Sequence, residues 1–190
     1  MPQVHPTAII DERAELASDV VVGPQCVIEG RVRLGPGCRL LHRVSLQGPV
    51  EAGEANVFYP NACIGFPPQD LKFAPEIEGP GVKIGDGNVF REGVSIHRAT
   101  GERPTTIGSH SYFMANCHAG HDSVVGDHVM LANGALLAGH VEIADQVIFG
   151  GNCAIHQFCR VGRLAMLSGV IAIVLDVPPF CTCYNMRSIE

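Results

Sequence analysis

Hydrophobic residues recur at every sixth position along most of the chain, with small or polar residues between them. The members of this series are Val4, Ile10, Leu16, Val22, Ile28, Leu34, Leu40, Leu46, Ala52, Phe58, Ile64, Ile84, Phe90, Ile96, Ile107, Phe113, Ala119, Val125, Leu131, Leu137, Ile143, Phe149, Ile155, Val161, Leu167 and Ile173. A helix repeats near 3.6 residues and an ordinary strand alternates, so neither explains a period of six. Hexads of this kind are typical of a parallel β-helix, and the sequence predicts an all-β fold.

Two further hexad positions have a narrow composition. The second is often glycine, as in Gly23 and Gly126, which suits a corner where a side chain would collide or φ must be positive. The fifth is small or β-branched, so positions one and five are predicted to face a narrow core. Three hexads form a triangular coil of 18 residues that rises one strand spacing, about 4.8 Å. Roughly 26 hexads give nearly nine coils and a rod on the order of 40 Å long.

Composition indicates one domain with reduced cysteines. The chain has 190 residues with 22 glycines, 13 prolines and no tryptophan. We predict a β-helix over residues 1–183 and a C-terminal tail over residues 184–190. Of eight cysteines, five occupy the inward fifth position as small hydrophobes, and three have no assigned role. The five are Cys26, Cys38, Cys117, Cys153 and Cys159; the three are Cys63, Cys181 and Cys183.

The chain carries no sign of export or of nucleic-acid binding. It shows no N-terminal signal sequence and no apolar stretch long enough to span a bilayer. The cysteine usage then favours a reduced compartment, the cytoplasm. A net charge of −6 argues against nucleic acid as a partner.

Two insertions interrupt the period. Fourteen residues separate the Ile64 and Ile84 hexads, and five residues, 102–106, precede Ile107. If each insertion loops out without using a hexad, the hexads three apart share one face of the prism. These are the hexads of Ile64, Ile96, Ala119, Leu137 and Ile155. Both loops are then predicted to leave from that face, where a solenoid would display its function.

Four of the nine histidines fall on this face in consecutive coils. They are His97, His121, His140 and His156. Asp122 and His140 are 18 residues apart, so they are predicted to stack. A lone surface histidine is usually without function, as we expect for His110 and His128 on another face. A row beside two loops instead predicts a functional site.

Residues 116–122 read N-C-H-A-G-H-D, which resembles the N-x-H-x-x-H-D signature of the bacterial UDP-N-acetylglucosamine 3-O-acyltransferase family. Further segments match that family in the same order: residues 4–9, 69–73, 96–98, 131–133, 137–140, 156–159 and 176–179. The resemblance covers nearly the whole chain. It implies a left-handed β-helix with two protruding loops, assembled as a homotrimer with sites in the clefts between protomers.

The implied activity is transfer of a 3-hydroxyacyl chain from acyl carrier protein to the 3-hydroxyl of UDP-N-acetylglucosamine. This is the first step of lipid A biosynthesis, and it requires no cofactor and no metal. Acyl transfer needs a base for the hydroxyl proton and a donor for the oxyanion. The resemblance implies that His121 is the base, that Asp122 orients it, and that the backbone N–H of Gly139 is the oxyanion donor.

The same resemblance implies the substrate contacts. The expected substrate-binding residues are Asp70, Lys72, His97, His118, His140, His156 and Gln157. A cation on the first loop fits a diphosphate, and a carboxylate fits sugar hydroxyls. Gly169 aligns with the position that limits acyl-chain length, where a glycine leaves the groove open to a longer chain.

The sequence departs from the family in two places. The family's helical C-terminal domain, which docks the carrier protein, is not expected here, and the second loop is shorter. Docking would then fall to Arg160, Arg163 and Arg187. Three other functions stay open: a coenzyme A-dependent acetyltransferase, a non-catalytic sugar-nucleotide binder, and a γ-class carbonic anhydrase. The last needs three histidines on zinc, and the sequence has no His-x-x-x-x-His pair of the kind that class uses.

Overall fold

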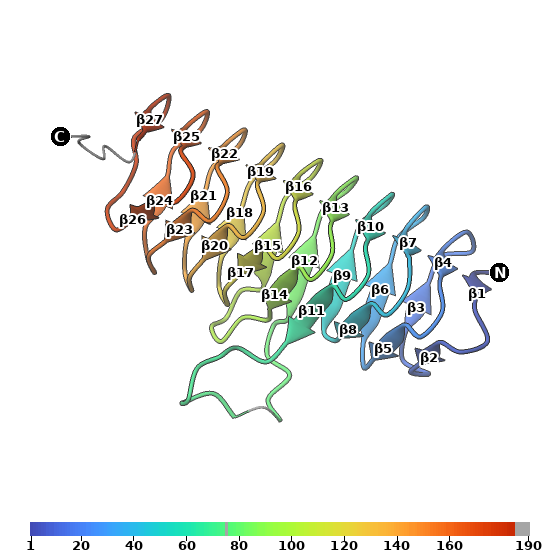
Figure 1. Cartoon of the computed structure of the whole chain (residues 1–190). Coiled ribbons are helices and arrows are strands. Elements are labelled where there is room, and N and C mark those ends of the chain that lie inside the picture. The colour runs from blue at the N-terminus through green and yellow to red at the C-terminus, as the bar shows by residue number, and fades with distance from the viewer. Residues whose placement is uncertain (75, 185–190) are drawn as a thin grey trace.

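The chain forms a left-handed parallel β-helix, as a computed structural model describes it for residues 1–74 and 76–184 (Figure 1). In that part of the chain all regular structure is β-strand, arranged in three parallel sheets. The first and last strands, β1 and β27, lie at opposite ends of the rod. Among the residues described, no helix has the length and hydrophobicity that a membrane crossing would need.

The first sheet has ten strands and runs the length of the rod. They are β1 (Gln3–Val4), β4 (Val21–Val22), β7 (Arg39–Leu40), β10 (Val57–Phe58), β13 (Val89–Phe90), β16 (Tyr112–Phe113), β19 (Met130–Leu131), β22 (Ile148–Phe149), β25 (Met166–Leu167) and β27 (Thr182–Cys183). Register pairs Phe58 with Phe90 and Phe90 with Phe113. Their ring centroids lie 5.0 and 5.2 Å apart, so aromatic rings stack along the core.

The second sheet has nine strands and confirms the predicted register. They are β2 (Ile9–Ile10), β5 (Val27–Glu29), β8 (Ser45–Gln47), β11 (Cys63–Phe66), β14 (Ser95–His97), β17 (His118–Ala119), β20 (Leu136–Leu137), β23 (Ala154–Ile155) and β26 (Ala172–Ile173). Each predicted residue pairs with the next one in the adjacent strand, in the order Ile64, Ile96, Ala119, Leu137 and Ile155. Both insertions therefore loop out without shifting the hexads.

The third sheet has eight strands and a charged outer face. They are β3 (Glu15–Leu16), β6 (Val32–Leu34), β9 (Val50–Ala52), β12 (Val82–Ile84), β15 (Thr105–Ile107), β18 (Val124–Val125), β21 (Glu142–Ile143) and β24 (Arg160–Val161). Arg33 pairs with Glu15 of the neighbouring strand at 2.9 Å, and Arg160 approaches Glu142 at 3.4 Å. Charges of both signs along this face suit contact with water.

Both loops leave from the ends of second-sheet strands, as predicted. One spans residues 67–81 between β11 and β12, and the other spans residues 98–104 between β14 and β15. Figure 1 shows them on the same side of the rod. The first is tied to earlier coils by Glu78, whose carboxylate lies 2.7 Å from Arg31 and 3.9 Å from Arg13.

The corners explain the hexad composition. Fourth-position residues adopt positive φ, for example Asn116 at 60° and His128 at 56°. Second-position glycines serve close approach instead: a Cβ on Gly126 would lie 2.9 Å from the backbone nitrogen of Asp145 in the next coil. Of the two reasons predicted for glycine there, collision with the next coil is the one that applies at Gly126.

The cysteines follow the predicted pattern. The five fifth-position cysteines are buried, and all eight cysteines, each within the described residues, are free thiols. Burial raises the pKa of the Cys117 and Cys153 thiols to about 11, so both stay protonated. Cys183 pairs with Leu167 although only 16 residues separate them. Cys181 and Cys183 therefore continue the hexad after a two-residue deletion and add a further rung to the first sheet.

Candidate active site

The candidate site lies at the corner between the second and third sheets, which we call the histidine corner. Asp122, His140 and Phe158 occupy the fourth hexad position in three successive coils, with φ of 60°, 60° and 66°. The backbone N–H of His140 donates to the carbonyl of His121 at 2.9 Å. Because these residues share one backbone conformation in successive coils, their side chains stack along the edge of the prism.

His121 and Asp122 form a close pair at this corner. Nδ1 of His121 lies 2.7 Å from Oδ2 of Asp122. The carboxylate also accepts hydrogen bonds from the Thr100 hydroxyl at 2.7 Å and from the backbone N–H of Gly101 at 2.9 Å. Burial alone would raise the pKa of Asp122, but hydrogen bonds from His121, Thr100 and Gly101 outweigh it and lower the pKa. Asp122 is therefore an anion that keeps a proton on Nδ1 and leaves Nε2 as a base.

Gly139 lies directly above the other ring nitrogen. A Cβ on Gly139 would lie 2.7 Å from Nε2 of His121, so only glycine fits without displacing the ring. The backbone N–H of Gly139 has no acceptor among the residues that the structure describes. A backbone donor without an acceptor in the described chain and an imidazole base thus lie side by side, and acyl transfer to a hydroxyl needs both kinds of group.

His140 and Phe158 complete the stack. Nε2 of His140 lies 3.8 Å from Oδ2 of Asp122, and its ring meets the His121 ring edge-on at 5.1 Å. On its other side the Phe158 ring stacks parallel at 4.6 Å. Phe158 was not predicted as a site residue, although it lies in the matched segment of residues 156–159.

His97 and His118 form a second row on the second sheet. Their rings lie 4.7 Å apart, and Ser95 Oγ lies 2.8 Å from Nδ1 of His118. Burial, followed by the nearby charges of His118 and His121, lowers the pKa of His97 to about 4. Burial likewise lowers the pKa of His118. Both rings are therefore neutral at pH 7.

The predicted single row of four histidines is in fact two rows on the same side of the prism. His97 and His156 occupy the second hexad position, His121 the third and His140 the fourth, so their rings do not form one continuous column. His121 contacts His140, whereas His97 contacts His118. His156 is exposed at the end of β23, with Nδ1 3.2 Å from the carbonyl oxygen of exposed Gln157.

Within the described residues, Asp70 and Lys72 make no hydrogen bond or ion pair with the histidine corner. Asp70 Oδ1 accepts the backbone N–H of Lys72 at 2.9 Å, and the Lys72 side chain is exposed. Arg98, which was not predicted as a site residue, is 4% exposed and donates to Gln47 Oε1 at 3.3 Å. Its guanidinium lies over the Phe73 ring at 5.7 Å, so it braces the first loop against the coils.

An apolar groove of about 400 Å³ lies beside the histidine corner on the second sheet. Its lining residues are His118, Leu136, Leu137, Ala138, Ala154, Ile155, His156, Ala172, Ile173 and Val174. The predicted chain-length residue, Gly169, does not line the groove within the described chain. It lies in the turn between β25 and β26, where a Cβ would come 3.0 Å from the carbonyl oxygen of Gly151.

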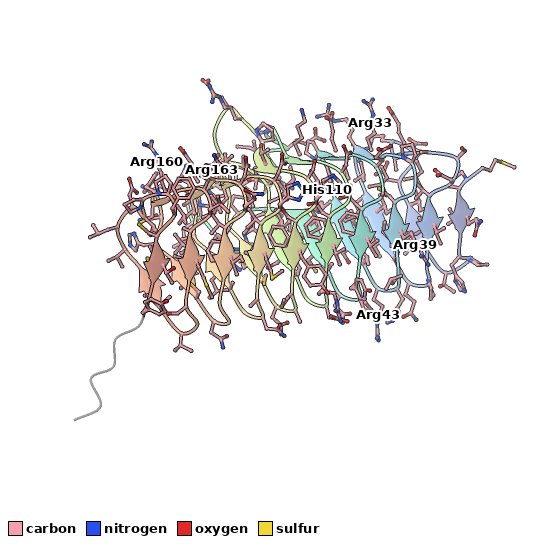
Figure 2. All side chains as sticks on the ribbon, turned by 90° about the horizontal axis from the view of Figure 1, so that it is seen from above. Arg33, Arg39, Arg43, His110, Arg160 and Arg163 are labelled. Atoms are coloured by element: carbon pink, nitrogen blue, oxygen red, sulfur yellow. The ribbon has the colours of Figure 1, made fainter. Side chains whose placement is uncertain are left out.

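The cations expected to dock a carrier protein form a mixed surface. Arg160 and Arg163 line one groove near the C-terminal end of the rod (Figure 2). Glu142, Asp145 and Asp176 line the same groove, so acidic side chains outnumber the two arginines there and the groove is not basic. Arg187 lies outside the described residues, as does all of the predicted tail except Tyr184.

The comparisons with known proteins agree with this geometry. The family model described as bacterial transferase hexapeptide (six repeats) matches residues 104–139, which contain His121, Asp122 and Gly139. A hexad prism with an imidazole–carboxylate pair at its corner defines the class of hexapeptide-repeat acyltransferases.

Within that class the relatives agree on one family. A curated relative from Thermodesulfovibrio yellowstonii, named acyl-(acyl-carrier-protein)–UDP-N-acetylglucosamine O-acyltransferase, is 46% identical over 99% of this chain and 73% of its own. The relative of the same name from Anaeromyxobacter sp. is 44% identical over 97% of this chain and 72% of its own. The solved structure of LpxA from Acinetobacter baumannii has a TM-score of 0.91 and 41% identity, covering 95% of this chain and 71% of that one. The chain belongs to the acyl-(acyl-carrier-protein)–UDP-N-acetylglucosamine O-acyltransferase family.

Proposed function

We propose that this protein transfers a 3-hydroxyacyl group from acyl carrier protein to the 3-hydroxyl of UDP-N-acetylglucosamine, the first step of lipid A biosynthesis. The single observation that carries the proposal is the meeting of His121 Nε2 and the Gly139 backbone at one corner. Nδ1 of the same ring is held by Asp122 at 2.7 Å. This arrangement offers a base to the attacking sugar hydroxyl and an oxyanion donor to the thioester carbonyl.

The reaction then follows from the two ring nitrogens of His121. Nε2 takes the proton of the sugar 3-hydroxyl as its oxygen attacks the thioester carbon. The tetrahedral oxyanion accepts a hydrogen bond from the backbone N–H of Gly139, while Asp122 stabilises the imidazolium that forms. Collapse breaks the carbon–sulfur bond, and His121 returns its proton to the departing thiolate. No redox step or additional reactant is needed.

The groove beside the histidine corner suits the acyl chain. Its wall is formed by Leu136, Ala154, Ala172 and neighbouring aliphatic residues, with His118 and His156 also on its lining. An apolar wall favours a hydrocarbon chain by the ordinary hydrophobic term. We assign Gly169 to the region beyond this groove, where it would control the space open to a long chain.

The polar residues around the corner are assigned to the sugar nucleotide. His118 lies in the same coil as His121, His140 in the next coil, and His156 and Gln157 in the one after it. His97 contacts His118 from the coil below. Asp70 and Lys72 extend from the first loop, where an exposed ammonium can meet a diphosphate. These assignments predict a rise in KM, rather than a fall in kcat, when the Lys72 charge is removed.

The proposed assembly is a homotrimer in the cytoplasm. A prism in a threefold ring turns two faces toward its neighbours and one toward solvent. The third sheet has the charged outer face, whereas Met130, Ile148 and Met166 give the first sheet an exposed apolar row. Ile148→Glu should therefore dissociate the trimer, as measured by light scattering after gel filtration. Eight free thiols and a carrier-protein donor fit the reducing cytoplasm.

The decisive assay offers UDP-N-acetylglucosamine with 3-hydroxyacyl carrier proteins of several chain lengths, and with acetyl-CoA in parallel. We expect an O-acylated sugar nucleotide from the carrier-protein donors only. Turnover with acetyl-CoA alone would instead assign the chain to a coenzyme A-dependent acetyltransferase. Binding of the nucleotide without product from any donor would make the protein a sugar-nucleotide binder.

A further inference from the structure

Three side chains at the histidine corner are close enough to hold one metal ion. The ligand atoms of His121, Asp122 and His140 all lie within 4.8 Å of one another. Oδ2 of Asp122 lies 2.7 Å from Nδ1 of His121 and 3.8 Å from Nε2 of His140. Two imidazoles and one carboxylate with an open fourth position are a ligand set that zinc accepts.

The three groups are already held in place. Thr100 and Gly101 hydrogen-bond the Asp122 carboxylate, and Phe158 stacks on the His140 ring. The side chains remain partly open to solvent, at 22%, 11% and 37% exposure for His121, Asp122 and His140. An ion can therefore reach the three side chains, and binding it costs little conformational entropy because these side chains are already held in position.

We propose that a divalent ion of the zinc type binds here as an inhibitor of the enzyme and not as a cofactor. The ion takes Asp122 Oδ2, His140 Nε2 and the Nδ1 of His121. The neutral ring changes tautomer as the ion binds: the proton on Nδ1 leaves to solvent, and Nε2 takes up a proton from solvent, so the ring keeps its single proton on Nε2. His121 can no longer accept the hydroxyl proton, so the ion and turnover exclude each other. The inhibition rests on the proposed function, whereas the binding does not.

The opposite corner provides a matched control. His110 and His128 stack at 5.2 Å in the same fourth hexad position. The neighbouring Asp127 carboxylate accepts the backbone N–H of Ser109 at 2.6 Å instead of facing the imidazoles. Within the described residues this pair belongs to no group of three metal-binding side chains. His128→Ala therefore removes a stacked imidazole without touching the proposed ligands.

The test is a titration of the reduced full-length protein with Co²⁺, followed by visible absorption and competition with Zn²⁺. We expect one ion per chain with a weak visible spectrum of nitrogen and oxygen ligands. Affinity should fall at least about tenfold in His140→Ala and in Asp122→Asn, and should be unchanged in His128→Ala. Circular dichroism confirms that each variant is folded.

Unchanged affinity in His140→Ala, no saturable binding, or the intense near-ultraviolet band of cobalt–thiolate ligation would each overturn the proposal. Zinc should also abolish acyl transfer, and a chelator should restore it. Cobalt binding without any acyl transfer would refute the proposed function and leave the metal site standing. Acyl transfer that saturating zinc does not inhibit would refute the inhibition.

Discussion

Two corners of the same prism carry stacked imidazoles, yet only one is arranged for chemistry. At the corner between the third and first sheets, which we call the acidic corner, Asp127 and Asp145 occupy the third hexad position (His110 of this corner is labelled in Figure 2). Their carboxylates accept the backbone N–H groups of the coil below, Ser109 at 2.6 Å and Asp127 itself at 2.9 Å. Both carboxylates are therefore used to hold one coil on the next.

At the histidine corner the same third position holds His121, Gly139 and Gln157. The carboxylate has moved to the fourth position, Asp122, where it binds the His121 ring and the second loop. The Gly139 N–H is left without an acceptor in the described chain. A one-position shift of a carboxylate therefore separates the acidic corner from the corner to which we assign catalysis.

The largest expected effect separates the two corners by activity. His121→Ala removes the base and should lower kcat by about 10³- to 10⁴-fold, with the fold and assembly intact. His128→Ala, at the acidic corner, should leave kcat within about twofold. The measurement is the steady-state rate of acyl transfer by each purified variant, compared with that of the wild type. Equal rates would remove His121 from the role of base.

The next prediction converts one corner into the other. In Gln157→Asp a carboxylate would accept the Gly139 N–H, as Asp127 accepts that of Ser109. The oxyanion would lose its donor, so kcat should fall about 10²-fold. Gln157→Ala is the control, because it also removes any substrate contact of Gln157 but leaves the N–H open. If both variants have the same kcat, the Gly139 N–H does not act as the oxyanion donor.

A smaller effect is expected from the second loop. Thr100→Val keeps the shape of the side chain but removes the hydroxyl that hydrogen-bonds Asp122 at 2.7 Å. A hydrogen bond to a carboxylate contributes about 1.5 kcal/mol, so kcat should fall about tenfold with KM unchanged. Thr100→Ser should restore the rate. A change confined to KM, or no rescue by serine, would mean that Thr100 does not act through Asp122.

The last prediction concerns the stability of the fold rather than the rate of transfer, and it involves the second row of histidines. The folded protein holds His97 neutral with a pKa of about 4, against 6.5 in an unfolded chain. As pH falls below 6.5 the unfolded state takes up a proton first, so stability falls until about pH 4. The loss from this residue is about 3 kcal/mol. Urea unfolding at pH 7 and pH 4 should show that loss in the wild type and its absence in His97→Gln. Parallel curves for the two proteins would contradict the burial of a neutral ring.

The fold was predictable because each coil repeats one backbone path. The period alone placed Ile96 opposite Ala119 and put Cys117 and Cys153 inside, since positions one and five must face the core. Both loops could be located because an insertion breaks the period at a defined strand end. The residues after β26 escaped the pattern because a two-residue deletion precedes Cys181 and Cys183.

The sequence could single out His121 and Asp122 as candidates, but it could not give the geometry around them. His121 and Asp122 stood out through a resemblance, whereas their partner Thr100 lies 22 residues away on a loop without a period. The split of the histidines into two rows depends on the left-handed backbone at Asp122 and His140. A signal for that backbone was present: fourth positions are rich in Asn, Asp, Gly and His, the residues that tolerate positive φ.

The central claim is that acyl transfer occurs at the histidine corner, where Nε2 of His121 and the backbone of Gly139 lie next to one another. A crystal structure of the protein with UDP-N-acetylglucosamine tests it most directly. The 3-hydroxyl oxygen should lie within about 3 Å of Nε2 of His121, with Asp122 still bonded to Nδ1. A sugar bound with that hydroxyl turned away from His121, or held at the acidic corner, would contradict the account.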